Sequence, residues 1–457
     1  MYSKITKLFT STAFISCSFF CFSASENMEA VFSAQTKTQK VLDVESALAR
    51  SQARLGIIPD WAAAEITDKA NIKYVSEESL AKEYAVVRHR MVALLNVWQR
   101  SLENNAHEYI HFGATTVDVY DTALVLQLID ASTVLISELK SLEAQMTTLA
   151  VEHKDTVMIG RTLGQHALPI TFGKKVATWL GENQRNIERL ENVQAKLKRS
   201  AILKGAVGSY LGLGDEAIKL ELYFAQELGM DKPYADDWHG SRDVFAEYAM
   251  TLAILSKSLG RIGNELFSLQ MTDIGETEEV RSSSAVGSST MPHKKNPSQS
   301  EALIFYSRKI PRMAEVVLDD MVNVFERDNT SRTNRELADI SLEAEKMVLA
   351  AQRLIKRLKV KPEVMAQNLN KTHGLIMAQR VAFYLAEKIG KTTANNKLHK
   401  LATKALEQQV SLRYLIENDQ ELATHFDQDT LDRLFDPHTY LGLAEEQVDA
   451  VIKSLQE

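Results

Sequence analysis

The placement of proline is the feature that most constrains the fold of this chain. Only eight prolines occur in 457 residues, and none falls between Pro59 and Pro169 or between Pro311 and Pro362. Proline breaks helices, because it lacks a backbone N–H and its ring collides with the preceding turn. These intervals therefore permit helices much longer than the average of three to four turns.

Apolar residues recur at helical spacing within these intervals. One stripe has steps of 7, 4, 3, 4 and 3 residues and consists of Leu128, Leu135, Leu139, Leu142, Met146 and Leu149. Similar stripes begin at Leu180 and at Met347, and alternating strand patterns are scarce. Such stripes are typical of core positions in packed helices. We predict an all-α fold with a central bundle of long helices.

Charge and composition narrow the classes of partner. The net charge is −7, and no basic run with interleaved aromatic residues occurs, so we expect no nucleic-acid partner. His, Asp and Glu residues form no cluster with metal-ligand spacing, so neither a metal nor another cofactor is expected.

The amino-terminal segment 1–27 differs from the rest. Two lysines precede an apolar, uncharged run over residues 8–24, and small residues stand at the end of this run. This order is typical of a secretory signal peptide, and the run is short for a membrane span. We predict a periplasmic or secreted protein; if Met28 is the true start, the protein is cytoplasmic. Both cysteines, Cys17 and Cys21, lie in this run, so no cysteine chemistry is expected in the mature chain.

Three polar segments that contain glycine interrupt the helical pattern. We call them the first, second and third polar segments: His111–Asp121, Gly160–Gly173 and Arg281–Glu301. Each falls where a loop or a helix start is expected. They can meet in space if the long helices run antiparallel and their ends cluster.

The third polar segment contains the most distinctive motif, Gly287–Asn296, which reads Gly-Ser-Ser-Thr-Met-Pro-His-Lys-Lys-Asn. The small residues over 281–289 predict a loop that can close over a ligand. Lys294 offers a positive charge to a carboxylate or phosphate, and Asn296 offers both a donor and an acceptor. The motif resembles the Gly-Ser-Ser-x-Met-Pro-x-Lys-x-Asn loop of the fumarase/aspartase superfamily, and the match is complete.

This resemblance implies roles for the loop residues. Ser288 is implied as the general base that removes a proton from the carbon next to a carboxylate. Ser289, Lys294 and Asn296 are implied as substrate-binding residues. A serine hydroxyl is a weak base at neutral pH and needs nearby cations and N–H groups, for which Lys294 and the loop amides are candidates.

The first polar segment resembles the His-x-Gly-x-Thr-Ser-x-Asp segment of the adenylosuccinate lyase and carboxymuconate cycloisomerase branch. Thr116 replaces the usual serine and keeps the hydroxyl. We expect Thr115 and Thr116 to bind a substrate carboxylate and His111 to take part in catalysis. Asp118 can cap the helix that follows.

The second polar segment departs from the family at one position. It resembles the Gly-Arg-Thr-His-x-Gln motif of adenylosuccinate lyases, in which the histidine is the general acid. This chain has Leu163 at the position of that histidine. Leucine cannot transfer a proton, so the departure weakens the adenylosuccinate lyase interpretation and leaves the acid unassigned.

Bacterial carboxymuconate cycloisomerases also lack that histidine and carry Gln-His-Ala next, like Gln165 and His166 here. By this resemblance Thr162 and Gln165 are expected to bind substrate. His166, His111 or water can supply the proton, and His166 can equally be a residue that orients the turn.

Two further segments extend the resemblance, which covers nearly everything after Met28. The run Trp238–Asp243 resembles the cycloisomerase Trp-His-x-x-Arg-Asp, and Glu326–Asp328 resembles the adenylosuccinate lyase Glu-Arg-Asp. Arg242 and Arg327 are therefore further candidates for substrate binding.

The resemblance also implies an organisation. We expect an amino-terminal helical domain over 28–121, the central bundle over 122–361 and a carboxy-terminal helical domain over 362–457. The family is tetrameric, so we expect a homotetramer whose active sites combine the three polar segments from different subunits. No membrane association is expected.

The expected activity is that of a lyase or cycloisomerase on a small polycarboxylate, with cleavage of a C–N or C–O bond, similar to 3-carboxy-cis,cis-muconate cycloisomerase. One alternative is an adenylosuccinate lyase that releases fumarate. Another is a non-catalytic relative with a structural or binding role. The intact Ser288, Lys294 and Asn296 argue against this last alternative, and Leu163 keeps it open.

Overall fold

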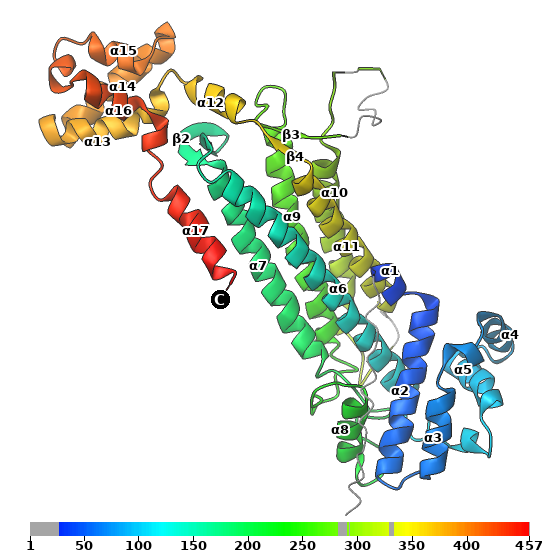
Figure 1. The fold of residues 1–457 in the computed structure, drawn as a ribbon. Coiled ribbons are helices and arrows are strands. Elements are labelled where there is room, and N and C mark those ends of the chain that lie inside the picture. The colour runs from blue at the N-terminus through cyan, green and yellow to red at the C-terminus, as the bar shows by residue number, and fades with distance from the viewer. Residues whose placement is uncertain (1–26, 282–289, 292, 329–332, 457) are drawn as a thin grey trace, which may run out of the picture.

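The centre of the molecule is a bundle of long helices. A computed structural model describes residues 27–281, 290–291, 293–328 and 333–456. The bundle helices are α6 (Thr116–Glu152), α7 (Phe172–Leu197), α9 (Asp243–Leu269), α10 (Ser298–Leu318) and α11 (Asn334–Lys356). They lie side by side and alternate in direction (Figure 1). The prediction of an all-α fold with a central long-helix bundle is confirmed.

The longest of these helices is α6, with 37 residues. At 1.5 Å per residue it is about 55 Å long. Leu128, Leu135 and Leu139 of the predicted stripe are fully buried along it. By length and composition α6 could cross a membrane, but 67% of its most apolar window is buried inside the protein, as in a core helix.

Short strands lie near one end of the bundle. The strands β1 (Val157–Thr162) and β2 (Gln165–Thr171) form an antiparallel hairpin directly between α6 and α7, with Thr162 paired to Gln165. The strands β3 (Thr277–Glu279) and β4 (Leu358–Val360) form a second antiparallel pair.

The residues before α6 form short and medium helices that surround α2. They are α1 (Met28–Val31), α2 (Ala34–Arg54), α3 (Asp60–Lys69), η1 (Ile72–Tyr74), α4 (Glu77–Val87), α5 (Arg90–Trp98), η2 (Gln99–Ser101) and η3 (Ala106–Tyr109). α2 packs against both α3 and α6, which joins this part to the bundle core.

Further elements join or follow the bundle helices. They are α8 (Ala217–Glu227), η4 (Asp319–Met321), α12 (Pro362–Asn370), η5 (Leu375–Met377), α13 (Ala378–Ile389), α14 (Lys391–Gln408), α15 (Leu412–Glu417), η6 (Leu422–His425), α16 (Gln428–Phe435), η7 (Pro437–Thr439) and α17 (Ala444–Ser454). Helices α13 to α16 share a small core of their own, whereas α17 returns to pack on α7. The predicted domain boundaries stay a prediction.

The alternating directions give the bundle two ends. At the first end α6, α9 and α11 begin and α7 and α10 finish. At the second end α6, α9 and α11 finish and α7 and α10 begin, and the hairpin and β3–β4 lie there.

Two glycines of α7 allow a matched test of how closely α6 and α7 approach. A Cβ on Gly173 would lie 2.6 Å from the Ala150 carbonyl oxygen and 2.7 Å from Lys154 Cα, both backbone atoms. On Gly181 the nearest atom would be the Arg185 side chain at 3.6 Å. Gly173→Ala should therefore lower the free energy of unfolding by about 1–3 kcal/mol, whereas Gly181→Ala should raise it by about 0.5–1 kcal/mol.

The measurement is chemical denaturation of both variants at equal protein concentration. A Gly173→Ala variant as stable as Gly181→Ala would contradict the close approach.

Candidate functional site

His111 lies at the first end, held by a carboxylate from α2. Its backbone N–H donates to Glu45 Oε2 at 3.1 Å, and its Nδ1 lies 2.7 Å from Glu45 Oε1. A carboxylate only accepts, so Nδ1 carries the proton and Nε2 is the nitrogen available to a ligand. Burial alone would lower the pKa of His111, but the hydrogen bond and charge of Glu45 outweigh burial and raise the pKa. His111 is therefore suited to donate a proton.

Thr115 and Thr116 mark the start of α6 beside His111. Thr115 is the N-cap residue, and its N–H donates to Asp118 Oδ2 at 3.0 Å. Asp118 therefore completes the cap of the helix, the role that the sequence predicted for it. Both threonines are half-buried at the positive end of a long helix dipole, a favourable place for a carboxylate.

Arg242 does not have the role that the sequence suggested. Its guanidinium is 2% exposed and bonds to Asp121 Oδ2 at 2.9 Å, Asp320 Oδ2 at 2.7 Å and Asn334 Oδ1 at 3.1 Å. These partners occupy the guanidinium inside the protein, so we correct its assignment from substrate binding to structural support. Arg327, also at the first end, is half-buried and forms no ion pair with any residue that the structure describes.

The tip of the β1–β2 hairpin lies at the second end and consists of Leu163 and Gly164. Both residues have positive φ, 53° and 76°, as a two-residue hairpin turn of this kind requires. Leucine is a poor choice there, because a left-handed backbone is strained for a residue with a Cβ. Its side chain is also fully exposed. Thr162 and Gln165 flank the tip and are exposed too.

His166 follows on β2 and is half-buried. Burial, followed by the charge of Arg161, lowers its pKa. Its Nδ1 has no hydrogen-bond partner within the described part of the chain. A lowered pKa keeps the ring neutral at neutral pH, which favours His111 over His166 as the proton donor.

The third polar segment also begins at the second end. Arg161 of the hairpin bonds to Glu276 at 2.9 and 2.6 Å, which fixes the hairpin beside the strand that precedes the segment. Ser288 and Ser289 lie outside the described residues. Lys294 is exposed and forms no ion pair with the residues placed by the structure.

The neighbouring Lys295 behaves differently from Lys294. It forms an ion pair with Glu278, which also pairs with Lys361 at 2.8 Å. Hydrogen bonds from these two lysines lower the pKa of Glu278 to about 2. Asn296 lies beyond, and its backbone carbonyl accepts a hydrogen bond from Arg281.

The described candidate residues thus fall into two groups at opposite ends of the bundle. The first-end group is His111, Thr115, Thr116 and Arg327. The second-end group is Thr162, Gln165, His166, Lys294 and Asn296. The length of α6, about 55 Å, separates them, so a single chain does not bring them together.

Glu45 was missed in the sequence. It lies in the middle of α2, buried among apolar neighbours, and its partner His111 is 66 residues away. The only signal was a charged residue on an apolar helix face, which is weak, because most such residues are exposed.

Comparisons with known proteins agree on a family. The sequence model of a family described as "Lyase" matches residues 21–311, and one described as "Adenylosuccinate lyase C-terminus" matches residues 374–451. Among curated proteins, the chain is 37% identical to an adenylosuccinate lyase of Methanocaldococcus jannaschii, over 94% of both chains. It is 35% identical to an N-acetyl-S-(2-succino)cysteine lyase of Dickeya dadantii, over 93% of this chain and 94% of that protein.

A third relative and one solved structure extend the likeness. The chain is 34% identical to a 3-carboxy-cis,cis-muconate cycloisomerase of Pseudomonas aeruginosa, over 93% of both chains. A crystal structure of a fumarate lyase from Mesorhizobium sp. BNC1 has a TM-score of 0.86 and 32% identity, and covers 93% of this chain and 97% of its own.

The pairing of His111 with Glu45 predicts a pH dependence. A histidine whose folded-state pKa is raised stabilises the fold fully below its ordinary value of 6.5 and loses this contribution as the pH rises through the folded-state pKa. Glu45→Gln removes the charge, so the pKa of His111 should fall and the stability difference from wild type should be largest below pH 6.5. NMR titration of His111 and denaturation at several pH values measure both effects.

Glu108→Gln is the control, since Glu108 is an exposed carboxylate that pairs with His107 instead. It should leave the titration of His111 unchanged. A Glu45→Gln variant in which His111 titrates as in wild type would contradict the assigned pairing.

Proposed function

Because the chain belongs to the fumarase/aspartase superfamily and is an enzyme of this type, we propose that it cleaves or forms a carbon–heteroatom bond β to a carboxylate of a small polycarboxylate. The observation that carries the proposal is the complete Gly287–Asn296 motif. As the chain is an enzyme of this type, the non-catalytic alternative is set aside.

We propose that the active site is assembled from different subunits of a homotetramer. Two features support this. The polar segments lie at opposite ends of α6 within one chain. The Leu163 side chain is fully exposed on a strained turn, so it gains nothing inside its own chain. Contact with another subunit would bring it and the rest of the hairpin to the first end of a neighbour.

Each group then has a role in the proposed reaction. Thr115 and Thr116 hold one carboxylate at the start of α6, and Lys294 holds a second negative charge. Ser288 takes the proton from the carbon next to a carboxylate, and the resulting aci-carboxylate needs donors fixed in advance around its oxygens. His111, through Nε2, is the proposed proton donor.

The remaining predicted residues complete the proposed site. Ser289 and Asn296 contact substrate from the loop, Thr162 and Gln165 from the hairpin, and Arg327 from the first end.

Leu163 favours particular leaving groups. A carboxylate, with a pKa of about 4, and a thiolate, with a pKa of about 8.5, can depart without a proton. An amine needs protonation before its bond to carbon breaks, and in the proposed site this proton has to come from His111, since Leu163 cannot supply it. A hairpin that ends in leucine therefore fits a lactone-forming carboxylate, as in the cycloisomerase relative, or a thioether, as in the N-acetyl-S-(2-succino)cysteine lyase relative. The adenylosuccinate lyase relative keeps a succinyl-amine as the second candidate.

The location of the protein stays a prediction. Export requires that residues 1–27 act as a signal peptide, and only residue 27 of this segment is described. The cytoplasmic alternative, with Met28 as the true start, stays a prediction as well.

Ser288→Ala tests the proposed base. It should lower kcat by about 10²–10⁴-fold, because a positioned base contributes that much, and should leave KM close to its original value. Steady-state kinetics with 3-carboxy-cis,cis-muconate, an S-succinyl thioether and a succinyl-amine supply the measurement. Ser284→Ala, in the same run of serines, is the matched control and should retain activity. Full turnover by Ser288→Ala would refute the mechanism.

Leu163→His tests the leaving-group argument. The wild type should turn over the carboxymuconate or the thioether faster than the succinyl-amine. The added imidazole should raise amine turnover by about 10²-fold, the low end for general acid catalysis, and change the others less. Leu406→His, at an exposed leucine of α14, controls for a surface histidine. If the wild type turned over the succinyl-amine faster than the other two substrates, the leaving-group argument would be wrong.

A further inference from the structure

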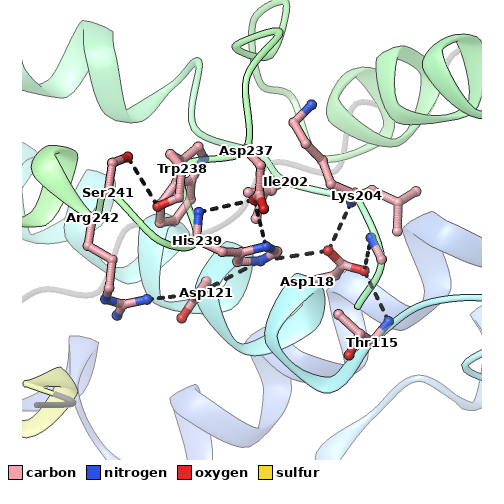
Figure 2. A network of polar contacts seen from close by, with 12 residues as sticks. Thr115, Asp118, Asp121, Ile202, Lys204, Asp237, Trp238, His239, Ser241 and Arg242 are labelled. Atoms are coloured by element: carbon pink, nitrogen blue, oxygen red, sulfur yellow. Dashed lines mark hydrogen bonds and ion pairs between the residues drawn. The ribbon is translucent and has the colours of Figure 1, made fainter. Parts of the chain in front are cut away.

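A buried ionic network supports the first end of the bundle (Figure 2). Its members come from α6, the segment after α7, the turn before α9, η4 and the first residue of α11. They are Asp118, Asp121, Lys204, Asp237, His239, Arg242, Asp320 and Asn334. The reaction proposed above uses none of them directly.

Asp118 fastens the first polar segment to the segment after α7. Its carboxylate is fully buried and accepts the N–H of Thr115 at 3.0 Å, Lys204 at 2.9 Å and Gly205 at 3.1 Å. Burial raises the pKa of Asp118, and the charge of His239 and the three N–H donors only partly offset burial. One carboxylate thus holds together the start of α6 and the glycine-rich loop over 204–214.

This loop lies directly against the first polar segment. A Cβ on Gly113 would lie 2.6 Å from the carbonyl oxygen of Gly212. Phe112 and Gly212 line the same surface hollow of about 260 Å³. The position of the loop therefore sets the size of this hollow beside the first polar segment.

His239 joins the loop to Asp118. Its Nδ1 lies 3.0 Å from Asp237 Oδ1, and its Nε2 faces Asp118 Oδ1 at 3.7 Å and Asp121 Oδ2 at 4.0 Å. The side chain is 2% exposed, and within the described residues Nε2 has no hydrogen-bond partner. On its other side Asp237 touches the loop, because a Cβ on Gly208 would lie 2.0 Å from Asp237 Oδ2.

The pairing of His239 with Asp237 is strong enough to affect titration. Burial would raise the pKa of Asp237, but the hydrogen bond and charge of His239 outweigh burial and lower the pKa. The ring and the backbone N–H of His239, which donates to the same oxygen at 3.1 Å, hold Asp237 in place, and Asp237 in turn confines Gly208.

Arg242 connects the same turn to the loop that carries Arg327. Besides Asp121 it binds Asp320, which also accepts a hydrogen bond from the Thr333 hydroxyl at 3.1 Å. Gly240 lies within the turn, and a Cβ there would lie 2.5 Å from the Glu326 carbonyl oxygen. The turn before α9 thus contacts both α6 and the segment between α10 and α11.

We infer that His239 is a positioning residue for the substrate-binding part of the first end. It holds the 204–214 loop and the start of α6 in register, so that Thr115 and Thr116 present their polar groups to substrate. The inference rests on the proposed function for its kinetic consequence, while the effect on loop position does not depend on it.

His239→Leu, which keeps bulk and removes both ring nitrogens, tests the inference in the full-length enzyme. Amide hydrogen exchange at Lys204 and Gly205 should become faster by about an order of magnitude, because their acceptor Asp118 loses its neighbour. With the best substrate of the panel above, kcat/KM should fall by about 100-fold. The loss should appear mainly in KM, since the misplaced groups bind substrate in its ground state.

His239→Asn is the conservative variant, because its amide can still donate to Asp237. In this variant, amide exchange at Lys204 and Gly205 should be as slow as in the wild type, and KM should return close to the wild-type value. His107→Leu, at a partly exposed histidine, is the control and should match the wild type. If His239→Leu does not fold, Asp237→Asn replaces it and should show the same two effects to a smaller degree.

The outcomes separate the two proposals. Unchanged exchange at Lys204 and Gly205 in a folded His239→Leu or Asp237→Asn variant would overturn the positioning role. Equal impairment of His239→Asn and His239→Leu would also overturn it, since the Asp237 contact would then not matter. If Ser288→Ala retained full turnover, the proposed function would fail, but the exchange experiment would still decide the role of His239.

Discussion

The length of α6 is the constraint on which the rest of the molecule depends. A helix of 37 residues holds its two ends about 55 Å apart. The polar segments that resemble the family's catalytic motifs lie at those two ends. No side chain spans such a distance. In the proposed assembly, these groups meet where the first end of one bundle lies against the second end of another copy.

The two ends are built in different ways. At the first end, buried carboxylates from α6 bind N–H groups and cations contributed by segments far away in sequence. Buried charges are costly unless each is paired. Such a network therefore adds little net stability, but any rearrangement that leaves one charge unpaired costs free energy. At the second end, a buried pair of Arg161 and Glu276 fixes the base of the hairpin, but the Leu163 tip and Lys294 are exposed. A rigid receiving surface and exposed contributing groups suit a site shared between subunits.

The sequence predicted what is local and periodic. The stripe from Leu128 to Leu149 identified α6, since core positions of one helix repeat within a few residues. The resemblance of Gly287–Asn296 correctly identified the superfamily. The role of Arg242 was wrong, because its partners Asp121 and Asp320 are 121 and 78 residues away and a sequence pattern cannot show that an arginine is already paired. The contacts of Glu45 with His111 and of His239 with Asp118 were missed for the same reason. The roles of Ser288 and Ser289 stay predictions.

Assembly of the site from separate chains is the central claim, and hybrid enzymes measure it most directly. Ser288→Ala and Thr116→Val chains, each nearly inactive alone, are co-expressed with different tags and purified through both. If each site takes the first polar segment from one chain and the third from another, random mixing leaves about one quarter of the sites with both segments intact. The account predicts recovery of activity up to that level. Hybrids that stay as inactive as their parents, while Ser288→Ala hybrids with wild-type chains remain active, would contradict it.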